Sequence, residues 1–305
     1  MWLLFAFSGP VLWAASTHID KYLVERYFKN SDTAVLMVFT ALIGLLALPF
    51  IWIFSPATLA LPLTNVFVLI SSGILYMSAM LFYLRAIQSA EASVVAPLFQ
   101  TSVIFTFILG YLLLGETLTL VNGLGVALII MGALILSLDT SFRIRAVRMR
   151  TLVFMLLCTF VLAFSTVIFK YYAVQDEFWS TTFWTFVGEA LFGAGILAVP
   201  RYLKQFMLLL RTNTGALLSI NASNELINLG GGLGVRFASL LAPVALISAI
   251  SSTTTLFVFF FGILLTVFFP KIASEDLSRA NLIQKGVAAL IVALGVVLAH
   301  FGGVS

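Results

Sequence analysis

Charged residues and cysteine are both scarce in this sequence. Asp, Glu, Lys and Arg make up 9% of the 305 residues, whereas a soluble globular domain carries about 25% charge. That shortage excludes a soluble protein. The single cysteine, Cys158, excludes an internal disulfide framework and a cysteine-based metal site.

Several motifs of known chemistry are absent as well. The sequence has no GxxxxGK loop for ATP and no HExxH for a catalytic metal. Its two histidines, His18 and His300, lie far apart, and no Ser–His–Asp arrangement is suggested. We therefore expect neither an enzyme nor a bound cofactor or metal. The net charge is +4, but the sequence has no patch of basic and aromatic residues, so we do not expect nucleic-acid binding.

Long apolar runs are what the sequence does contain. Hydrophobic residues make up 62% of the chain, the mean hydropathy is +1.14, and a helix needs about 20 apolar residues to cross a bilayer. No basic stretch precedes the first run, so we expect a span there rather than a cleaved signal peptide. The predicted transmembrane helices cover residues 2–24, 33–53, 64–86, 91–114, 119–138, 151–173, 179–199, 213–237, 241–269 and 282–301.

The second half of the sequence repeats the first. "STHIDKYLV" (16–24) matches "STVIFKYYA" (165–173), and "GLLALP" (44–49) matches "GILAVP" (195–200) at nearly the same offset. We infer an all-α membrane protein of two five-helix repeats, residues 1–140 and 151–305, joined by the basic linker 141–150. Because five is an odd number of spans, the second repeat must insert upside down, as in the inverted repeats of secondary transporters.

The basic residues predict the orientation in the membrane. Lys and Arg favour cytoplasmic loops. The odd-numbered connectors and their helix ends hold fourteen of the 16 Lys and Arg residues, and the even-numbered side holds only Lys170 and Arg236. We therefore expect a protein of the inner membrane with both termini outside and residues 141–150 in the cytoplasm.

Residues 91–136 carry a family resemblance. The stretch reads "EASVVAPLFQTSVIFTFILGYLLLGETLTLVNGLGVALIIMGALIL", with Pro97, an "LGE" at the helix end, and Gly125 and Gly132 in the next helix. It resembles the EamA-type branch of the drug/metabolite transporter superfamily. In the second half, "LLAPVALISAISSTTTLFVFFFGILL" (240–265) takes the same role, although "FFPKIASED" replaces the "LGE". The resemblance implies transport of a small solute. Typical members keep both termini in the cytoplasm, opposite to the orientation predicted here.

The eighth apolar segment carries the strongest candidate site. Asn221, Asn224, Glu225 and Asn228 follow the spacing i, i+3, i+4, i+7, which places them on one face of a helix. An ionisable group inside a span is costly and suggests function. A carboxylate at mid-depth could attract a cation or carry a proton, while the amides bind substrate. Alternatively, the amides only link helices and satisfy the carboxylate.

Other polar residues inside the spans could line a substrate cavity. Glu189 lies near mid-depth, and a structural ion pair with Lys170 is not favoured because the depths differ by about two turns. The fourth and ninth segments each carry a polar stripe, which forms either a cavity wall or a small-residue packing surface. These stripes contain Ser93, Pro97, Gln100 and Thr101, and Ser248, Ser251, Ser252 and Thr255. Trp13 either stacks on a substrate or simply packs.

The repeat places one lysine and one arginine near each mouth of the protein. For Arg85 and Arg236 we expect long side chains that reach the lipid headgroups. Lys21 and Lys170 are instead predicted gate residues. His18, Lys21, Tyr22 and Glu25 share one helix face, and Asp20 lies on another. A histidine near carboxylates suits proton access, so we assign His18 and Asp20 to that role as a hypothesis.

These features predict a secondary active transporter that works by alternating access and is coupled to protons. Its substrate would be a small organic metabolite such as an amino acid, a nucleobase or an organic cation. The alternative is a flippase of the same fold for a lipid or a lipid-linked sugar. Besides the bilayer and its substrate, no partner is needed, because one chain of ten helices can enclose a cavity.

Overall fold

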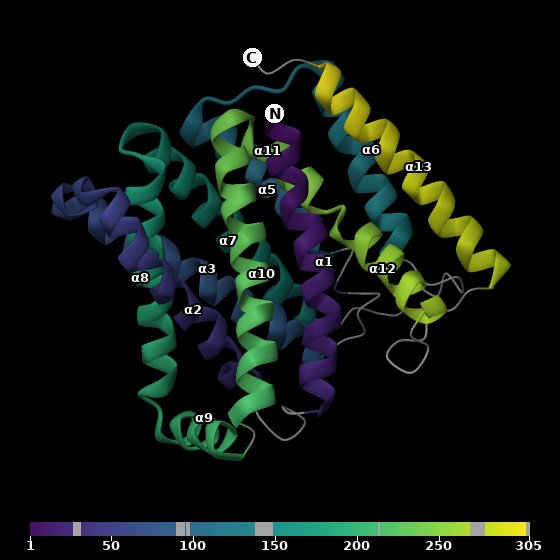
Figure 1. The fold of residues 1–305 in the computed structure, drawn as a ribbon. Helices are drawn as coiled ribbons and strands as arrows, with labels where there is room; N and C mark the ends of the chain where they lie inside the picture. Colours follow the sequence, from purple (N-terminus) through teal and green to yellow (C-terminus); the bar gives the residue numbers. More distant parts are fainter. Residues whose placement is uncertain are drawn as a thin grey trace.

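The computed structural model is built from helices (Figure 1). It describes residues 1–26, 32–89, 95, 98–137, 149–212, 214–268 and 278–302, and this part of the chain contains no strand. The first half comprises α1 (Trp2–Arg26), α2 (Thr33–Phe54), the short 3-10 helix η1 (Pro56–Ala60), α3 (Leu63–Ser89), α5 (Thr101–Leu109), the π-helical turn η2 (Gly110–Leu114) and α6 (Leu120–Ser137). The second half comprises α7 (Met149–Gln175), α8 (Phe178–Leu197), α9 (Pro200–Thr212), α10 (Thr214–Leu241), α11 (Val244–Ser251), α12 (Thr254–Phe268) and α13 (Arg279–Phe301).

Several of these helices suit a lipid bilayer. Within the described residues, six helical segments are long and apolar enough to cross a membrane, and α8 with α9 makes a seventh if that bent pair is one span. The prediction of an all-helical, multi-pass membrane protein is therefore confirmed. Helix α10 is not among the six, although it is 28 residues long.

The fourth and ninth predicted spans are not single continuous α-helices. The fourth ends in the π-helical turn η2, and Gly115 follows with a φ of 68°, a left-handed conformation that glycine adopts without strain. Helix α6 then starts after Thr119, whose hydroxyl accepts a hydrogen bond from the Asn122 amide at 3.2 Å. The break predicted between residues 114 and 119 is thus present. The ninth span divides into α11 and α12 at Ser252 and Thr253.

Helices from the two halves of the chain pack against each other in pairs. Helix α1 runs along α10, α3 along α7, α2 against α8, and α6 beside α13 (Figure 1). Two helix contacts bring backbones together. In the α6–α13 pair, a Cβ at Gly295 would meet the Gly125 carbonyl oxygen at 2.8 Å. Gly73 and Gly188 form a similar contact between α3 and α8, which also pack against each other. The pairing joins the halves into one bundle.

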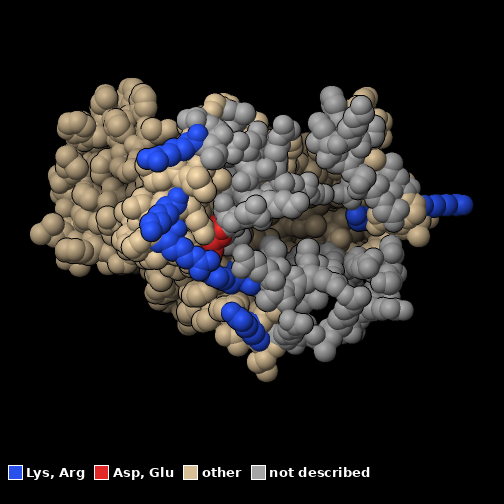
Figure 2. Space-filling view, turned by 90° about the horizontal axis from the view of Figure 1, so that it is seen from below, with Lys and Arg blue, Asp and Glu red and all other residues tan. Residues whose placement is uncertain are grey.

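Helix α9 was not predicted from the sequence. It begins at Pro200, a residue that suits the first turn of a helix, and it bends by 99° from α8. Arg201, Lys204 and Arg211 are exposed along it. Helix α9 lies at the lower end of the bundle in Figure 1, and the marked termini lie at the upper end. Figure 2 views the molecule from below and shows basic side chains gathered on that face.

Candidate functional site

The polar face of α10 lies against α1 and α2. Asn221, Asn224 and Glu225 are 2%, 0% and 2% exposed, so the predicted stripe is buried inside the bundle. Helix α10 folds with this face inward because α1 supplies polar partners for it. The Nδ2 atom of Asn224 donates a hydrogen bond to Asp20 Oδ1 at 2.6 Å, and the Ser16 hydroxyl reaches Asp20 Oδ2 at 3.4 Å.

Glu225 is held from a third helix. The Thr40 hydroxyl of α2 donates to Glu225 Oε1 at 2.8 Å, and the Asn228 side chain also lies close to this carboxyl group. The other carboxyl oxygen, Oε2, is buried and has no hydrogen-bond partner. Asp20 is near enough for its charge to act on Glu225. Two carboxyl groups therefore share one buried site between α1, α2 and α10. We call Asp20, Glu225 and the buried amides Asn221 and Asn224 the Glu225 cluster.

Asp20 and His18 were predicted to lie on different faces of α1, and the Asp20 face is the one that contacts this cluster. The Nε2 atom of His18 lies 3.0 Å from the Val258 carbonyl oxygen of α12, so the two side chains contact different helices. The side chains of Lys21 and Glu25 lie outside the described residues. Trp13 donates from its indole nitrogen to the Asn228 carbonyl at 3.4 Å and contacts Gly231, as a packed tryptophan would.

A second buried charge pair joins α10 to α8. Arg236 Nη2 lies 2.5 Å from Glu189 Oε1, and the two side chains are 17% and 8% exposed. Rings of Tyr76, Phe169 and Phe186 surround the guanidinium at 5.7, 5.2 and 5.0 Å from their centres, which is within cation–π range. The expectation that Arg236 reaches the headgroups is therefore wrong, because a buried carboxylate and aromatic faces hold it inside. Arg85 lies 3.9 Å from Asp32 and is more exposed.

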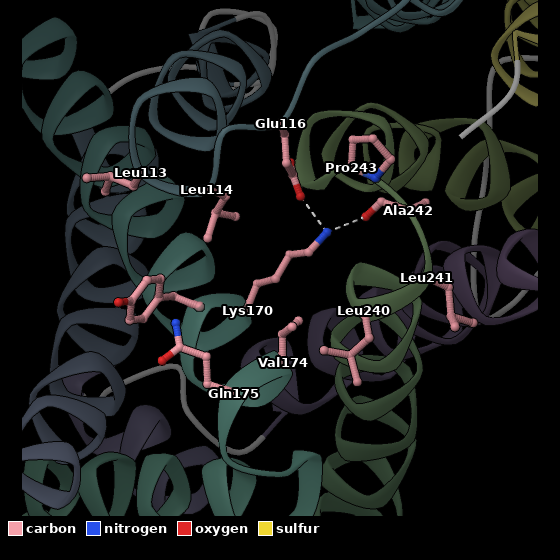
Figure 3. Close-up of a pocket in the computed structure, with 11 residues that line it drawn as sticks. Leu113, Leu114, Glu116, Lys170, Val174, Gln175, Leu240, Leu241, Ala242 and Pro243 are labelled. Carbon is pink, nitrogen blue, oxygen red and sulfur yellow. Dashed lines mark hydrogen bonds and ion pairs between the residues drawn. The ribbon is translucent and has the colours of Figure 1, made fainter. Parts of the chain in front are cut away.

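Lys170 forms an ion pair at the upper end of the bundle. Its ammonium group contacts the Glu116 carboxylate and donates to the Ala242 carbonyl at 2.8 Å (Figure 3). The same carboxylate accepts from the Val244 amide at 2.8 Å, which places an anion at the start of α11, where a helix dipole favours it. These contacts tie α7 and the end of the fourth span to the junction of α10 and α11. Lys170 and Glu116 also line an open pocket of about 450 Å³.

Glu116 contacts Lys170 and lines the pocket, but it was not predicted as a candidate site residue from the sequence. It is the glutamate of the "LGE", an acidic residue directly after a span, and that position was the available signal.

The other predicted cavity residues are less closely grouped. Gln100 is buried and its Oε1 has no partner. Thr101 shares a hydrogen bond with Thr159 at 2.8 Å, and the Ser251 hydroxyl bonds back to the Ile247 carbonyl. Helix α5 packs against α11, with Val103 and Ile250 in one apolar cluster. The structure thus fits packing between these two stripes, while Ser93 and Pro97 lie outside the described residues.

The described residues contain no group of three or more His, Cys, Asp or Glu side chains suited to a metal ion. Three charged features lie on or next to α10: the Glu225 cluster, the buried Arg236–Glu189 pair and the Lys170–Glu116 pair at the pocket. Ionisable side chains that face the interior of a helical bundle and pair with one another are typical of functional sites in multi-pass membrane proteins.

Residues 1–138 match the model of the EamA-like transporter family. A stretch of 66 residues is 46% identical to a Sinorhizobium sp. protein named "Uncharacterized transporter in cobO 3'region". The match covers 22% of this chain and 47% of that protein, so the chain spans about half the length of the curated relative. A solved crystal structure shares the fold over 98% of this chain and 97% of its own, with a TM-score of 0.69 at 15% identity. The predicted resemblance to an EamA-type transporter is confirmed.

Proposed function

We propose that the protein is a secondary active transporter that moves a small organic metabolite by alternating access, coupled to protons. The observation that carries this proposal is the Glu225 carboxyl group, buried between α1, α2 and α10 without an ion-pair partner among the described residues. An unpaired charge is expensive in a bilayer. Such a carboxyl group can be buried readily when it is protonated and can release the proton when water reaches it, as coupling requires.

The substrate we propose is an amino acid, a nucleobase or an organic cation. Carboxylates attract the positive groups of such molecules, and amides such as Asn228 and Gln100 can bind their polar atoms.

Ten transmembrane helices in two inverted repeats, residues 1–140 and 151–305, are part of the proposal. Helix pairing supports it: α1 against α10 has its counterpart in α3 against α7, while α2 pairs with α8 and α6 with α13. Under an inverted two-fold relation between the repeats, these are the contacts that we expect. The Lys170–Glu116 pair, joining elements from both repeats, would then close the mouth at the upper end.

We propose that the protein lies in the inner membrane with both termini outside. The end of the bundle that carries α9 then faces the cytoplasm. The basic residues of α9 support it, because positive charge favours the cytoplasmic side. One chain is sufficient for the proposed mechanism.

A flippase for a lipid or a lipid-linked sugar remains the second candidate. The observation in its favour is the pocket at Lys170, whose lining includes Leu113, Val174 and Leu241, all exposed on the outer surface of the bundle. An apolar tail could lie against these side chains while a headgroup contacts the ion pair.

The test is flux in proteoliposomes that contain the purified protein, with and without a pH gradient. We expect gradient-driven uptake of at least one solute class, and Glu225→Gln should abolish that dependence. Ser223→Ala is the matched control, since Ser223 is exposed on the same helix. Unchanged gradient-driven flux in Glu225→Gln would remove Glu225 from the mechanism, and transport of labelled lipid alone would favour the flippase.

A further inference from the structure

The Glu225 cluster contains more hydrogen-bond acceptors than donors. Asn221 Oδ1, Asn224 Oδ1 and Glu225 Oε2 are all buried without a hydrogen-bond partner. The identity of the Asn224 oxygen follows from chemistry: its amide nitrogen must face Asp20, because an ionised carboxylate only accepts. Buried polar atoms are normally satisfied, so three unsatisfied oxygens on neighbouring turns of one helix need an explanation.

One proton does not satisfy this group of oxygens. A protonated carboxyl group supplies a single O–H donor, which can reach one of the two amide oxygens and leaves the other without a partner. A small hard cation, by contrast, contacts several oxygens at once, and amide, carbonyl and carboxylate oxygens are the ligands that such cations prefer.

The negative charge of this site also favours a bound cation. Asp20 and Glu225 bring two carboxyl groups together between α1 and α10. None of the ion pairs between described residues includes either of them. Among the described residues, their hydrogen-bond partners include the hydroxyls of Ser16 and Thr40 and the side-chain amide of Asn224, all of which are neutral. A cation would lower the cost of burying this negative charge.

We propose that the Glu225 cluster binds Na⁺, with oxygens of Asn221, Asn224 and Glu225 as ligands and the Asp20 carboxylate as a second nearby negative charge that attracts the ion. The ion occupies the place that the coupling proton would otherwise take, so Na⁺ and H⁺ compete for one site. This inference rests on the proposed transport function and names a second coupling ion for the same site.

The first experiment measures thermal unfolding of the purified full chain in detergent. NaCl, KCl and choline chloride are compared at equal ionic strength, at pH 6 and pH 8. A ligand that binds only the folded protein raises the melting temperature, so we expect a saturable rise with Na⁺ alone. The rise should be larger at pH 8, because fewer protons compete. Equal melting temperatures in all three salts at both pH values would overturn the proposal.

Variants locate the ion. Glu225→Gln should lose the Na⁺-dependent rise, and Asn221→Ala should raise the half-saturating Na⁺ concentration about tenfold or more, as loss of a metal contact commonly does. Asn221→Ala exchanges one neutral side chain for another, so it tests the site if Glu225→Gln does not fold. Ser223→Ala should behave like the unaltered chain. A Na⁺ effect that is unchanged in both Glu225→Gln and Asn221→Ala would place the ion elsewhere and overturn the proposal.

Flux measurements separate this inference from the proposed function. Uptake into proteoliposomes driven by a Na⁺ gradient at constant pH supports the Na⁺ site. Uptake driven by a pH gradient with no response to Na⁺ overturns the Na⁺ site and leaves proton-coupled transport intact. No gradient-driven uptake of any solute, together with Na⁺ binding to the purified chain, would support the site and reject the transport function.

Discussion

Arg236 and Glu189 form an ion pair at 2.5 Å in the interior of the bundle, between α10 and α8. The guanidinium also faces the rings of Tyr76, Phe169 and Phe186, so its charge is balanced by one carboxylate and by three aromatic faces. The pair links two helices, and its side chains are 17% and 8% exposed. Each side chain therefore supplies the opposite charge that makes burial of the other tolerable.

Removing one partner of this pair should destabilise the protein strongly. Arg236→Met leaves the Glu189 carboxylate buried without a cation, and such changes cost about 3–5 kcal/mol. We expect a marked fall in the melting temperature in detergent. The double variant Arg236→Met/Glu189→Gln removes both charges and should recover most of the loss. A double variant as unstable as the single one would mean that the rings, and not the pair, hold Arg236.

The Lys170–Glu116 pair should control access to the upper pocket. Glu116→Gln weakens the contact with Lys170 and the cap on α11, so we expect the mouth to open more often. A cysteine introduced at Ala242, which lines the pocket and is 2% exposed, should then react faster with a thiol reagent. The native Cys158 is buried and adds little background.

The control for this experiment is Glu116→Asp, which keeps a negative charge beside Lys170 and the Val244 amide and should be labelled more slowly than Glu116→Gln. Equal labelling rates with and without the Glu116→Gln change would show that the ion pair does not govern access.

The close contact between α6 and α13 should not tolerate a side chain. Gly125 and Gly295 bring the two backbones together, and an added Cβ would meet backbone atoms. Gly295→Val should therefore separate the helices, with a loss of roughly 1–3 kcal/mol or more. Gly286 lies on the same helix in open space, so Gly286→Ala should leave the melting temperature unchanged. Similar melting temperatures for both variants would contradict this packing.

Single cysteines can test the orientation. In a Cys158→Ser background, a cysteine at Ala57 in η1 should react with a membrane-impermeant maleimide added outside intact cells. A cysteine at Lys204 in α9 should react only after the membrane is opened. Both positions are exposed, so reactivity reports the side of the membrane. The reverse pattern would place the termini in the cytoplasm and contradict the charge-based orientation.

The sequence predicted the helical class and the buried face of α10 because both depend on local periodicity. Spacing of three and four residues is enough to place Asn221, Asn224 and Glu225 together. It could not pair Asp20 with Asn224, or Arg236 with Glu189, since these contacts join helices that are far apart in the chain. Helix α9 was missed because its charged residues and short length do not fit a span. Glu116 was missed because its partner lies in the other half.

The polar face of α10 has a consequence for how the protein is made. This helix is not among those apolar enough to cross a membrane alone, and its polar side chains find their partners on α1 and α2. We therefore expect α10 to leave the insertion machinery for the lipid only when α1 is already beside it. Biogenesis of the second half then depends on a helix made at the very start of synthesis, and a chain without α1 should stall with α10 outside the bilayer.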